Sequence, residues 1–411
     1  MRVAFFVREV IPEGGVALAT FRLATALNEL GHESRVLYCS GDPPPQLRGL
    51  GCRIEGDPKA EAAPARLRHS LEQFDPAVVV VGSGRSQDLT EAIEVAPTLL
   101  HAHLHMGTCP DLARHWSRLG RPCGVRAGWR CAVLRPVLGC SELKRAVRPG
   151  PIQAQRALLR LLSSGEAGVL CVSTDQAEVY LDHGVPRSRI AVVPNLGIRA
   201  TASELADASA RTPEEWRSAT AFVGRLSKPK GAALLDELAR SLPAEARLRV
   251  FGDGYLAEAL SSLPDGVRCG HVAQDQIAGV LMWARAVLFP SIWPEPGGIV
   301  GIDAQVMGVP LAAFDTGAPR HWPGAQRFGL DELGGMAEWL AARPPRTEPR
   351  NPEAVSEAQA RYWRQVTAHG ADAIARFARA GRFGDDDDDP VEALMRGPEP
   401  EAAPTGAAES R

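Results

Sequence analysis

Short apolar runs alternate along this chain with longer segments whose apolar residues recur every three or four positions. The short runs predict buried strands and the longer segments predict amphipathic helices. We expect strands at residues 2–7, 34–39, 77–81, 98–103, 169–172, 190–193, 247–251, 286–289 and 311–314, and another that begins at Thr220. Helices are expected at 15–30, 64–74, 88–95, 174–183, 232–242, 299–307 and 352–380. Repeated strand–helix alternation is typical of α/β proteins with doubly wound parallel sheets.

The alternation stops at two places, which divide the chain. Residues 199–215 are polar and alanine-rich without a clear period, so we expect a linker between domains there. The 411 residues are enough for two domains, each of about 150–200 residues. We therefore expect a first domain at 1–198, a second at 216–345 and a helical segment at 346–384. Residues 385–411 form an acidic tail with too few apolar groups to fold, and we predict disorder.

The stretch from 286 to 310 has the most informative pattern. An apolar strand ends at Pro290, a loop follows, and a helix begins near Ile299. Gly297 and Gly298 leave backbone N–H groups uncovered at the start of that helix, where an anion such as phosphate is stabilised. Glu295 precedes this point and Asp303 follows one turn into the helix, so both carboxylates could accept hydroxyl protons of a sugar or ribose.

A second candidate site begins where the strand at Thr220 ends. Gly224 is followed by Arg225 and Lys230 on the loop before the next helix. Two cations at the carboxyl end of a strand could hold a diphosphate. The next strand ends at Gly252, which belongs to the same candidate site.

Histidines and cysteines are dense between residues 101 and 140. His101, His103 and His105 alternate at the end of an expected strand, which places them on one face and predicts that at least one of them faces the ligand. Four cysteines follow at 109, 123, 131 and 140. Their spacings of 14, 8 and 9 residues match no common zinc finger, so the spacing argues against a metal site.

Residues 121–150 carry seven basic side chains and one acid, interleaved with apolar residues. This segment is either a solvated basic helix or a peripheral contact with an anionic membrane. Across the whole chain 46 basic residues balance 49 acidic ones, so nothing predicts a nucleic-acid partner. The start has no signal-peptide core and no apolar run is long enough to span a membrane, so we expect a cytoplasmic protein. Its eight cysteines are then mostly free thiols or ligands.

Taken in order, these motifs resemble glycosyltransferase family 4 over about residues 1–330. The residues that carry the resemblance are Gly14-Gly15, Val172-Ser173, Gly184-Val185-Pro186, Pro194-Asn195, Gly224-Arg225-Leu226, Lys230-Gly231, Gly252-Asp253-Gly254, Pro290-Ser291, Glu295-Pro296, Asp303-Ala304 and Gly308-Val309-Pro310. The resemblance implies a GT-B architecture, in which two Rossmann-like domains face a cleft and the segment 346–384 crosses back to the first, acceptor-side domain. It also implies transfer of a sugar from a nucleotide diphosphate donor, with retention and without a bound metal or other cofactor.

The resemblance assigns a role to each matching residue. Arg225 and Lys230 would neutralise the diphosphate, Glu295 would hold hydroxyls of the donor sugar, and Asp303 would accept the ribose hydroxyls. Gly297, Gly298 and Ile299 would offer backbone N–H groups, and Gly15 would let the backbone approach the donor. Gly224 and Gly252 would also belong to the donor-binding site. His103, six residues before Cys109-Pro110, would lie beside the reacting carbon, with His101 as the other candidate. The chain departs from the family at Asp303, where glutamate is usual, at Gly297, and at Pro319-Arg320-His321.

Two alternatives stay open beside an active glycosyltransferase acting on an unidentified acceptor. One is a catalytically silent relative that binds a nucleotide sugar or serves as a scaffold. The other is a metal-dependent α/β enzyme built on the histidine and cysteine cluster.

Overall fold

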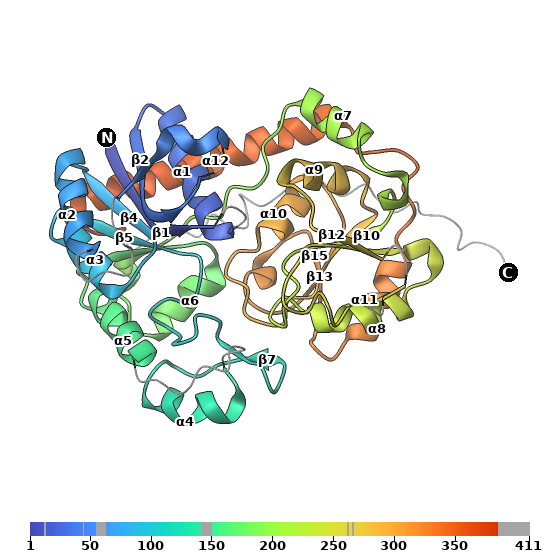
Figure 1. Ribbon diagram of the computed structural model, residues 1–411, viewed down its shortest axis with the longest axis horizontal. Helices are drawn as coiled ribbons and strands as arrows, with labels where there is room; N and C mark the ends of the chain where they lie inside the picture. Colours follow the sequence, from blue (N-terminus) through green and yellow to red (C-terminus); the bar gives the residue numbers. More distant parts are fainter. Residues whose placement is uncertain are drawn as a thin grey trace. The chain divides into compact units, whose positions relative to one another are not determined.

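The computed structural model describes residues 1–11, 14–43, 45–54, 63–140, 150–260, 263–264 and 267–384 (Figure 1). The chain divides into two compact units, each described here by itself. Unit 1 contains Met1–Leu196 and, within the described residues, the chain from Trp363 onward, whereas unit 2 contains Gly197–Tyr362. Glu13, the basic residues at 144, 145 and 148, and the predicted acidic tail lie outside the described residues.

Unit 1 is built on a seven-stranded parallel sheet with the order β3-β2-β1-β4-β5-β8-β9. Its strands are β1 Arg2–Val10, β2 Glu33–Gly41, β3 Gly51–Arg53, β4 Val78–Ser83, β5 Thr98–Ala102, β8 Gly168–Cys171 and β9 Ile190–Val192. The helices are α1 Gly15–Glu29, α2 Ala63–Phe74, α3 Ser86–Ile93, α4 Trp129–Leu138, α5 Gly150–Ser163 and α6 Thr174–Asp182. A small antiparallel hairpin, β6 His115–Trp116 with β7 Arg121–Pro122, lies between β5 and α4 in the chain.

Unit 2 is built on a six-stranded parallel sheet with the order β12-β11-β10-β13-β14-β15. Its strands are β10 Thr220–Val223, β11 Leu248–Phe251, β12 Arg268–Gly270, β13 Ala286–Phe289, β14 Leu311–Phe314 and β15 Ala325–Phe328. The helices are α7 Ala202–Ala210, α8 Leu235–Ser241, α9 Gln274–Trp283, α10 Ile299–Val306 and α11 Leu333–Ala341, and α12 Pro352–Ala380 runs from unit 2 into unit 1.

The central strands confirm the predicted parallel α/β class. β13 and β14 are buried at all four of their residues, because helices cover both faces of such a sheet, and this explains their unbroken apolar runs. Ser173 caps α6 as its position before the helix suggests, since its Oγ accepts the N–H of Gln176 at 3.3 Å.

Three of the differences between predicted and observed boundaries concern positions near the site or the expected linker. Part of the expected linker is α7, whose capping box pairs Thr201 with Glu204, a local signal that the lack of period concealed. The helix expected from residue 232 begins with a 3-10 turn at Ala232–Leu234 and becomes α-helical only at Leu235, because Gly231 enters it in a left-handed conformation. β5 ends at Ala102, so His103 lies just beyond the strand.

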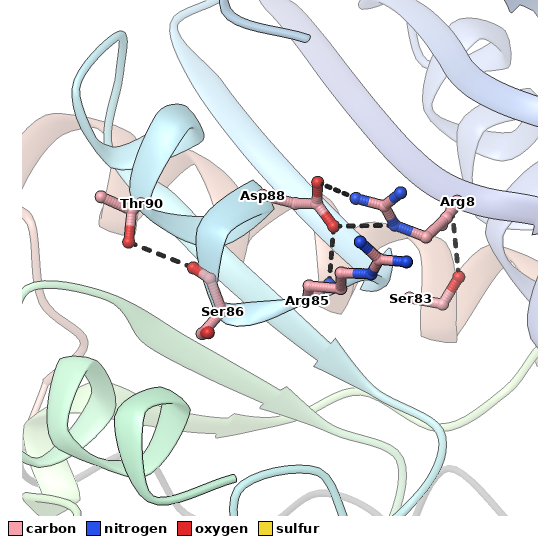
Figure 2. A network of polar contacts seen from close by, with 6 residues as sticks. All are labelled: Arg8, Ser83, Arg85, Ser86, Asp88 and Thr90. Carbon is pink, nitrogen blue, oxygen red and sulfur yellow. Dashed lines mark hydrogen bonds and ion pairs between the residues drawn. The ribbon is translucent and has the colours of Figure 1, made fainter. Parts of the chain in front are cut away.

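A buried polar network fixes the carboxyl ends of β1 and β4 (Figure 2). The guanidinium of Arg8 on β1 forms an ion pair with Asp88, its Nε lying 3.0 Å from Oδ2, and the side chain of Asp88 is only 1% exposed. Asp88 also accepts the N–H of Arg85 at 2.6 Å and so caps α3. The backbone N–H of Arg8 donates to Ser83 Oγ at 3.2 Å, which ties the two strand ends together.

Replacing Asp88 by asparagine is expected to lower the free energy of unfolding of unit 1 by about 3 kcal/mol, because the Arg8 cation would lose its buried partner. The matched control is Asp75→Asn. Asp75 also pairs with an arginine, Arg2, but its side chain is 78% exposed, and such a surface pair contributes about 0–1 kcal/mol. Thermal unfolding of both variants measures the difference, and equal losses would contradict the prediction.

Candidate active site

Four loops meet at the carboxyl edge of the sheet in unit 2. They follow β11, β10, β13 and β14, which are neighbours in the sheet although they are not consecutive in the chain. Backbone hydrogen bonds join one loop to the next, from Leu226 N–H to Asp253 O at 2.8 Å, from Ile292 N–H to Pro229 O at 2.9 Å, and from Ala318 N–H to Glu295 O at 2.7 Å. Ligands of open α/β sheets bind at this edge.

Two glycines allow the loops to approach so closely. Gly231 has φ +72°, and a Cβ there would lie 1.8 Å from the carbonyl oxygen of Pro290. Gly252 has φ +143°, and a Cβ there would lie 1.9 Å from the carbonyl oxygen of Gly224. Any larger residue at either position would have to push the neighbouring backbone away. Gly224 and Gly252 therefore lie together, as the sequence grouped them.

An ion pair between Lys230 and Glu295 lies where the β10 and β13 loops meet. Lys230 Nζ donates to Glu295 Oε2 at 2.6 Å, and the two side chains are 22% and 6% exposed. The ammonium also lies 5.7 Å from the ring centre of Phe289 and 5.5 Å from that of Trp293. The structure thus brings together two of the predicted site residues that are 65 positions apart.

Two neighbours of Glu295 were not among the predicted site residues. Trp293 Nε1 donates to Glu295 Oε2 at 2.7 Å and Ser291 Oγ donates to the same oxygen at 3.2 Å. Together with Lys230 they give Oε2 three donors, whereas Oε1 makes no hydrogen bond within the described residues. The carboxylate is held on one side and keeps an acceptor for a ligand hydroxyl on the other. The signal in the sequence that could have identified Trp293 and Ser291 is their position, two and four residues before Glu295.

Arg225, the other predicted cation, has a different environment. Its residue is exposed, and its guanidinium has no hydrogen-bond or ion-pair partner in the part of the chain that the structure describes. It follows Gly224 directly at the end of β10. We refer to the four loops that follow β11, β10, β13 and β14 as the loop layer. An exposed guanidinium beside this loop layer is available for an anionic ligand.

The start of α10 has the open geometry that the glycines predict. Gly298 has φ +32°, and a Cβ there would lie 2.7 Å from the ring of Phe289 and 2.8 Å from that of Trp322. The N–H groups of Ile299 and Val300 form no hydrogen bond within the described residues, as expected for the first turn of a helix. Gly297 is buried beside them. These N–H groups carry the positive end of the helix dipole.

Asp303 is 4% exposed, and its carboxylate contacts the backbone of a neighbouring segment. Its Oδ1 accepts the backbone N–H of Ile198 at 2.6 Å, at the start of unit 2, and a Cβ at Gly197 would lie 2.1 Å from the same atom. The carboxylate therefore anchors the incoming chain segment. The ribose contact that the family resemblance implies for Asp303 stays a prediction.

The histidines of unit 1 are close together. The rings of His101 and His103 lie 4.0 Å apart, and a hydrogen bond joins the side chain of His103 to that of Asn195. Burial lowers the pKa of His103 to about 4, although the contact with Asn195 acts in the opposite direction. Burial, with a smaller contribution from His103, lowers the pKa of His101 well below its usual value. Both rings are neutral at pH 7.

This burial makes the stability of unit 1 depend on pH. Because the folded pKa of His101 is lowered, the unfolded chain binds a proton first as the pH falls below about 6.5, and stability is lost from there downward. His101→Leu should reduce the slope of the unfolding free energy between pH 6.5 and 5 by about 1.4 kcal/mol per pH unit. Chemical denaturation of the wild type and of His101→Leu at several pH values measures the change, and an unaltered slope in His101→Leu would contradict the assignment.

Gly15 and the histidines and cysteines between residues 101 and 140 are the remaining positions that the sequence analysis singled out. Gly15 is exposed at the first residue of α1, the place expected for a close approach to a ligand. The three histidines and the four cysteines, all within the described residues, provide no three ligand atoms within 4.8 Å of one another.

Comparison with protein families finds a matching family model for each half of the chain. Residues 14–196 match the model of the glycosyl transferase 4-like domain, and residues 217–330 match that of glycosyl transferases group 1. Together the two models span more than two thirds of the sequence in the order that the fold shows. The chain belongs to the family 4-like glycosyltransferases. No match to a curated protein sequence was found.

Solved structures show that this glycosyltransferase has the GT-B fold. Anabaena Alr3699/HepE, solved with UDP and glucose, is 15% identical with a TM-score of 0.62, and the match covers 92% of this chain and all of HepE. WaaG, a glycosyltransferase involved in lipopolysaccharide biosynthesis, is 16% identical with a TM-score of 0.60, covering 90% and 99%. AviGT4, involved in avilamycin A biosynthesis, is 18% identical with a TM-score of 0.54, covering 93% and 99%.

The described helices of the glycosyltransferase include none that combines the length and the apolar composition needed to cross a membrane.

Proposed function

We propose that this glycosyltransferase transfers a sugar from a nucleotide diphosphate donor to an acceptor with retention of anomeric configuration. The observation that carries the proposal is the part-buried Lys230–Glu295 pair at the meeting point of the β10 and β13 loops. The relative HepE has been solved with UDP-glucose, which makes UDP-sugars the first donors to test. Retention rests on the resemblance to family 4.

The electrostatics of the loop layer suit a leaving diphosphate. Bond cleavage at the anomeric carbon places negative charge on the departing diphosphate, and fixed positive groups stabilise that charge. Lys230 and exposed Arg225 on the β10 loop, and the N–H groups at the start of α10, would supply this positive charge. None of these groups needs a metal ion to act.

The Glu295 carboxylate would position the donor sugar. Its Oε2 is held by three donors, which fixes the plane of the carboxylate, and Oε1 would accept a sugar hydroxyl. Gly231 and Gly252 would keep the loops close enough for this contact. The ribose role of Asp303 and the role of Gly15 belong to the same proposal.

His103 would contribute from unit 1 as a neutral imidazole. With its pKa lowered to about 4, the ring can donate and accept hydrogen bonds at pH 7 without adding a positive charge. Asn195 holds its orientation through the side-chain hydrogen bond. A neutral ring beside the reacting carbon would hydrogen-bond to a sugar hydroxyl.

The test is a panel of UDP-, GDP-, ADP- and TDP-sugars offered to the purified protein. At least one should raise the Tm and be hydrolysed slowly without an acceptor, and the anomer released, followed by NMR, should retain the donor configuration. A Tm increase without any turnover, together with normal cellular function of Glu295→Ala, would favour the silent scaffold. No response to any donor would refute donor binding, and an inverted anomer would refute retention.

A specific observation favours membrane contact as a second part of the proposal. Trp129, Val133 and Val137 are 73%, 57% and 57% exposed, and their spacing places them on one face of α4. Arg130, on the same helix, is exposed, whereas the Arg126 guanidinium before the helix pairs with Asp182. An apolar stripe with an exposed cation beside it fits the surface of an anionic bilayer. The cytoplasmic location expected from the sequence stays a prediction.

Sedimentation with vesicles tests this contact. The protein should bind vesicles that contain phosphatidylserine and bind less to phosphatidylcholine alone, and Trp129→Ser/Val133→Ser should lose most of the binding. The control Leu181→Ser changes an exposed leucine on α6, outside the stripe, and should bind normally. Equal binding of the double variant and the wild type would refute a contact through α4.

A further inference from the structure

Unit 2 has a cavity of about 380 Å³ outside the loop layer, which we call the α7–α9 cavity. It lies between the end of α7, the 3-10 turn Glu214–Trp216 and the start of α9. Small-molecule sites have volumes of about 300–1,000 Å³, so the cavity is large enough for a ligand. The side chains in its walls that can recognise a ligand are those of Arg211, Thr212, Pro213, Trp216, Asp275 and Gln276.

The wall that α7 and α9 form is fixed because the two helices pack closely. A Cβ at Gly279 of α9 would lie 2.5 Å from the carbonyl oxygen of Ala208 and 2.5 Å from Oγ1 of Thr212. Thr212 Oγ1 donates to that carbonyl oxygen at 2.9 Å. Trp283 Nε1 of α9 donates to the carbonyl oxygen of Ser209 at 3.0 Å. These contacts hold the end of α7 beside α9.

The turn that carries Trp216 is held against the sheet. Arg249 of β11 is 8% exposed, and its Nε donates to the carbonyl oxygen of Glu215 at 2.8 Å. The rings of Trp216 and buried Phe251 meet edge to face, with their centres 5.0 Å apart, which is a favourable geometry for an aromatic pair. Trp216 therefore has a fixed place in the wall before a ligand binds.

The start of α9 forms the third side of the cavity. Gln276 Oε1 accepts the backbone N–H of Ala273 at 3.0 Å, as in a capping box, so this contact fixes the side chain across the first turn. The contact uses the amide oxygen of Gln276 and leaves its NH₂ group for other partners. Asp275 lies in the same turn and is exposed.

Four polar groups in these walls make no hydrogen bond or ion pair within the described residues. They are the Arg211 guanidinium, Trp216 Nε1–H, the Asp275 carboxylate and the Gln276 NH₂ group. The first, second and fourth are donors, and the carboxylate is an acceptor. A ligand in the cavity would therefore meet donors and an acceptor whose capacity the protein does not use.

The charges of the cavity balance, which favours a neutral ligand. Arg211 and Asp275 are both exposed and carry opposite charges. Asp275 would repel a phosphate or carboxylate group, and Arg211 would repel an ammonium group. A neutral ligand that both donates and accepts hydrogen bonds suits the two side chains together.

A pyranose sugar has the required combination of groups. Its hydroxyls both donate and accept, so they can satisfy Arg211, Asp275 and the two remaining donors. Its C–H face can pack against the rings of Trp216 and Pro213, as apolar groups pack on aromatic side chains. A zwitterionic amino acid would match the two charges but would bring one carboxylate for donors on three different side chains.

We propose that the α7–α9 cavity binds a sugar unit of a neutral glycan. Arg211, Trp216 and Gln276 would donate to its oxygens, and Asp275 would accept from a hydroxyl. No residue of the loop layer lines the cavity, so a sugar bound here would hold a glycan on unit 2 without entering the transfer reaction. The proposal therefore goes beyond donor binding and does not depend on retention.

The indole N–H signal of Trp216 reports on this cavity directly. In the nitrogen–proton NMR spectrum of the isotope-labelled full-length protein it is one of 8 indole signals, and Trp216→Phe identifies it by its loss. The probes are maltotriose and the methyl glycosides of glucose, galactose, mannose and N-acetylglucosamine. At least one of them should shift this signal in a saturable way.

A double variant tests the assigned side chains. Arg211→Ala/Asp275→Ala should weaken binding of the responding probe by about tenfold or more, because hydrogen bonds to charged groups are the stronger ones. Both residues are exposed, so the other indole signals should stay in place and show that the fold is intact. The matched control is Lys228→Ala/Glu338→Ala, which removes an exposed cation and an exposed anion of unit 2 outside the cavity and should bind like the wild type.

Three results would overturn the proposal. One is a Trp216 signal that no sugar moves, and another is equal affinity of the wild type and Arg211→Ala/Asp275→Ala. The third is a response to phenylalanine or uridine monophosphate but to none of the sugars. Lys230→Ala, which lacks the loop-layer cation, should keep the wild-type shift, so failure of the donor site and failure of this cavity are distinguishable.

Discussion

Lys230→Ala is expected to lower kcat/KM for the sugar donor by about 10²–10³-fold, the usual loss when one fixed group that stabilises developing negative charge is removed. Lys230 is the most buried cation of the loop layer, with a side chain 22% exposed, and its removal also leaves Glu295 without its ion-pair partner. Initial rates of donor hydrolysis or transfer measure the effect.

Lys228→Ala is the matched control for this prediction. Lys228 lies two residues earlier on the same loop and is exposed. Its loss should change kcat/KM by less than threefold. If both alanine variants lose activity equally, the effect comes from general surface charge, and the specific role of Lys230 is refuted. Glu295→Gln, which keeps the shape of the side chain, should lose activity as well.

Gly231→Ala is expected to lower the free energy of unfolding by about 3 kcal/mol or more and kcat by about 10²-fold. The left-handed conformation costs a side chain about 1 kcal/mol, and the new Cβ would lie 1.8 Å from the Pro290 carbonyl oxygen, so the β10 and β13 loops must separate. A displacement of about 1 Å at a catalytic group can cost 10²-fold in rate.

Gly270→Ala separates the effect of the left-handed backbone conformation from the effect of the contact between the loops. Gly270 has φ +76°, close to the +72° of Gly231, but its new Cβ would meet nothing within 4 Å. We expect a Tm decrease of about 2–4 °C for Gly270→Ala and of about 6–12 °C for Gly231→Ala. The activity of Gly270→Ala should stay within a few-fold of the wild-type activity. If the two variants showed similar decreases in Tm and activity, backbone conformation alone, and not contact between the loops, would explain the effect of Gly231→Ala.

The sequence predicted the central strands and several helices because their signals are local, whereas α5, α9, α11, β12 and β15 were not predicted. The apolar runs at 286–289 and 311–314 coincide with β13 and β14, and the amphipathic segment 352–380 coincides with α12. Predictions failed where a local signal was overlooked, as at the capping box of α7. They also failed where a tertiary contact changed the local geometry, as at the 3-10 turn after Gly231.

The candidate site was only partly predictable. Glu295, Lys230 and the glycines were predicted as site residues because each follows a strand in a pattern that resembles a known family. The pairing of Lys230 with Glu295 could not be predicted, because it depends on β10 lying between β11, the next strand in the chain, and β13, which comes two strands later. For Asp303 the sequence predicts a ribose contact, which stays a prediction, whereas its hydrogen bond with the N–H of Ile198 came only from the structure.

Alone, the amino-acid order determined which segments become strands and helices, where glycine is needed and which charges follow each strand, since these depend on neighbours a few residues away. Only the tertiary structure decided which loops meet, which carboxylate holds Lys230, and that Arg135 of α4 pairs with Asp111. Contacts between distant residues follow from strand order and packing, and distance along the chain does not encode them.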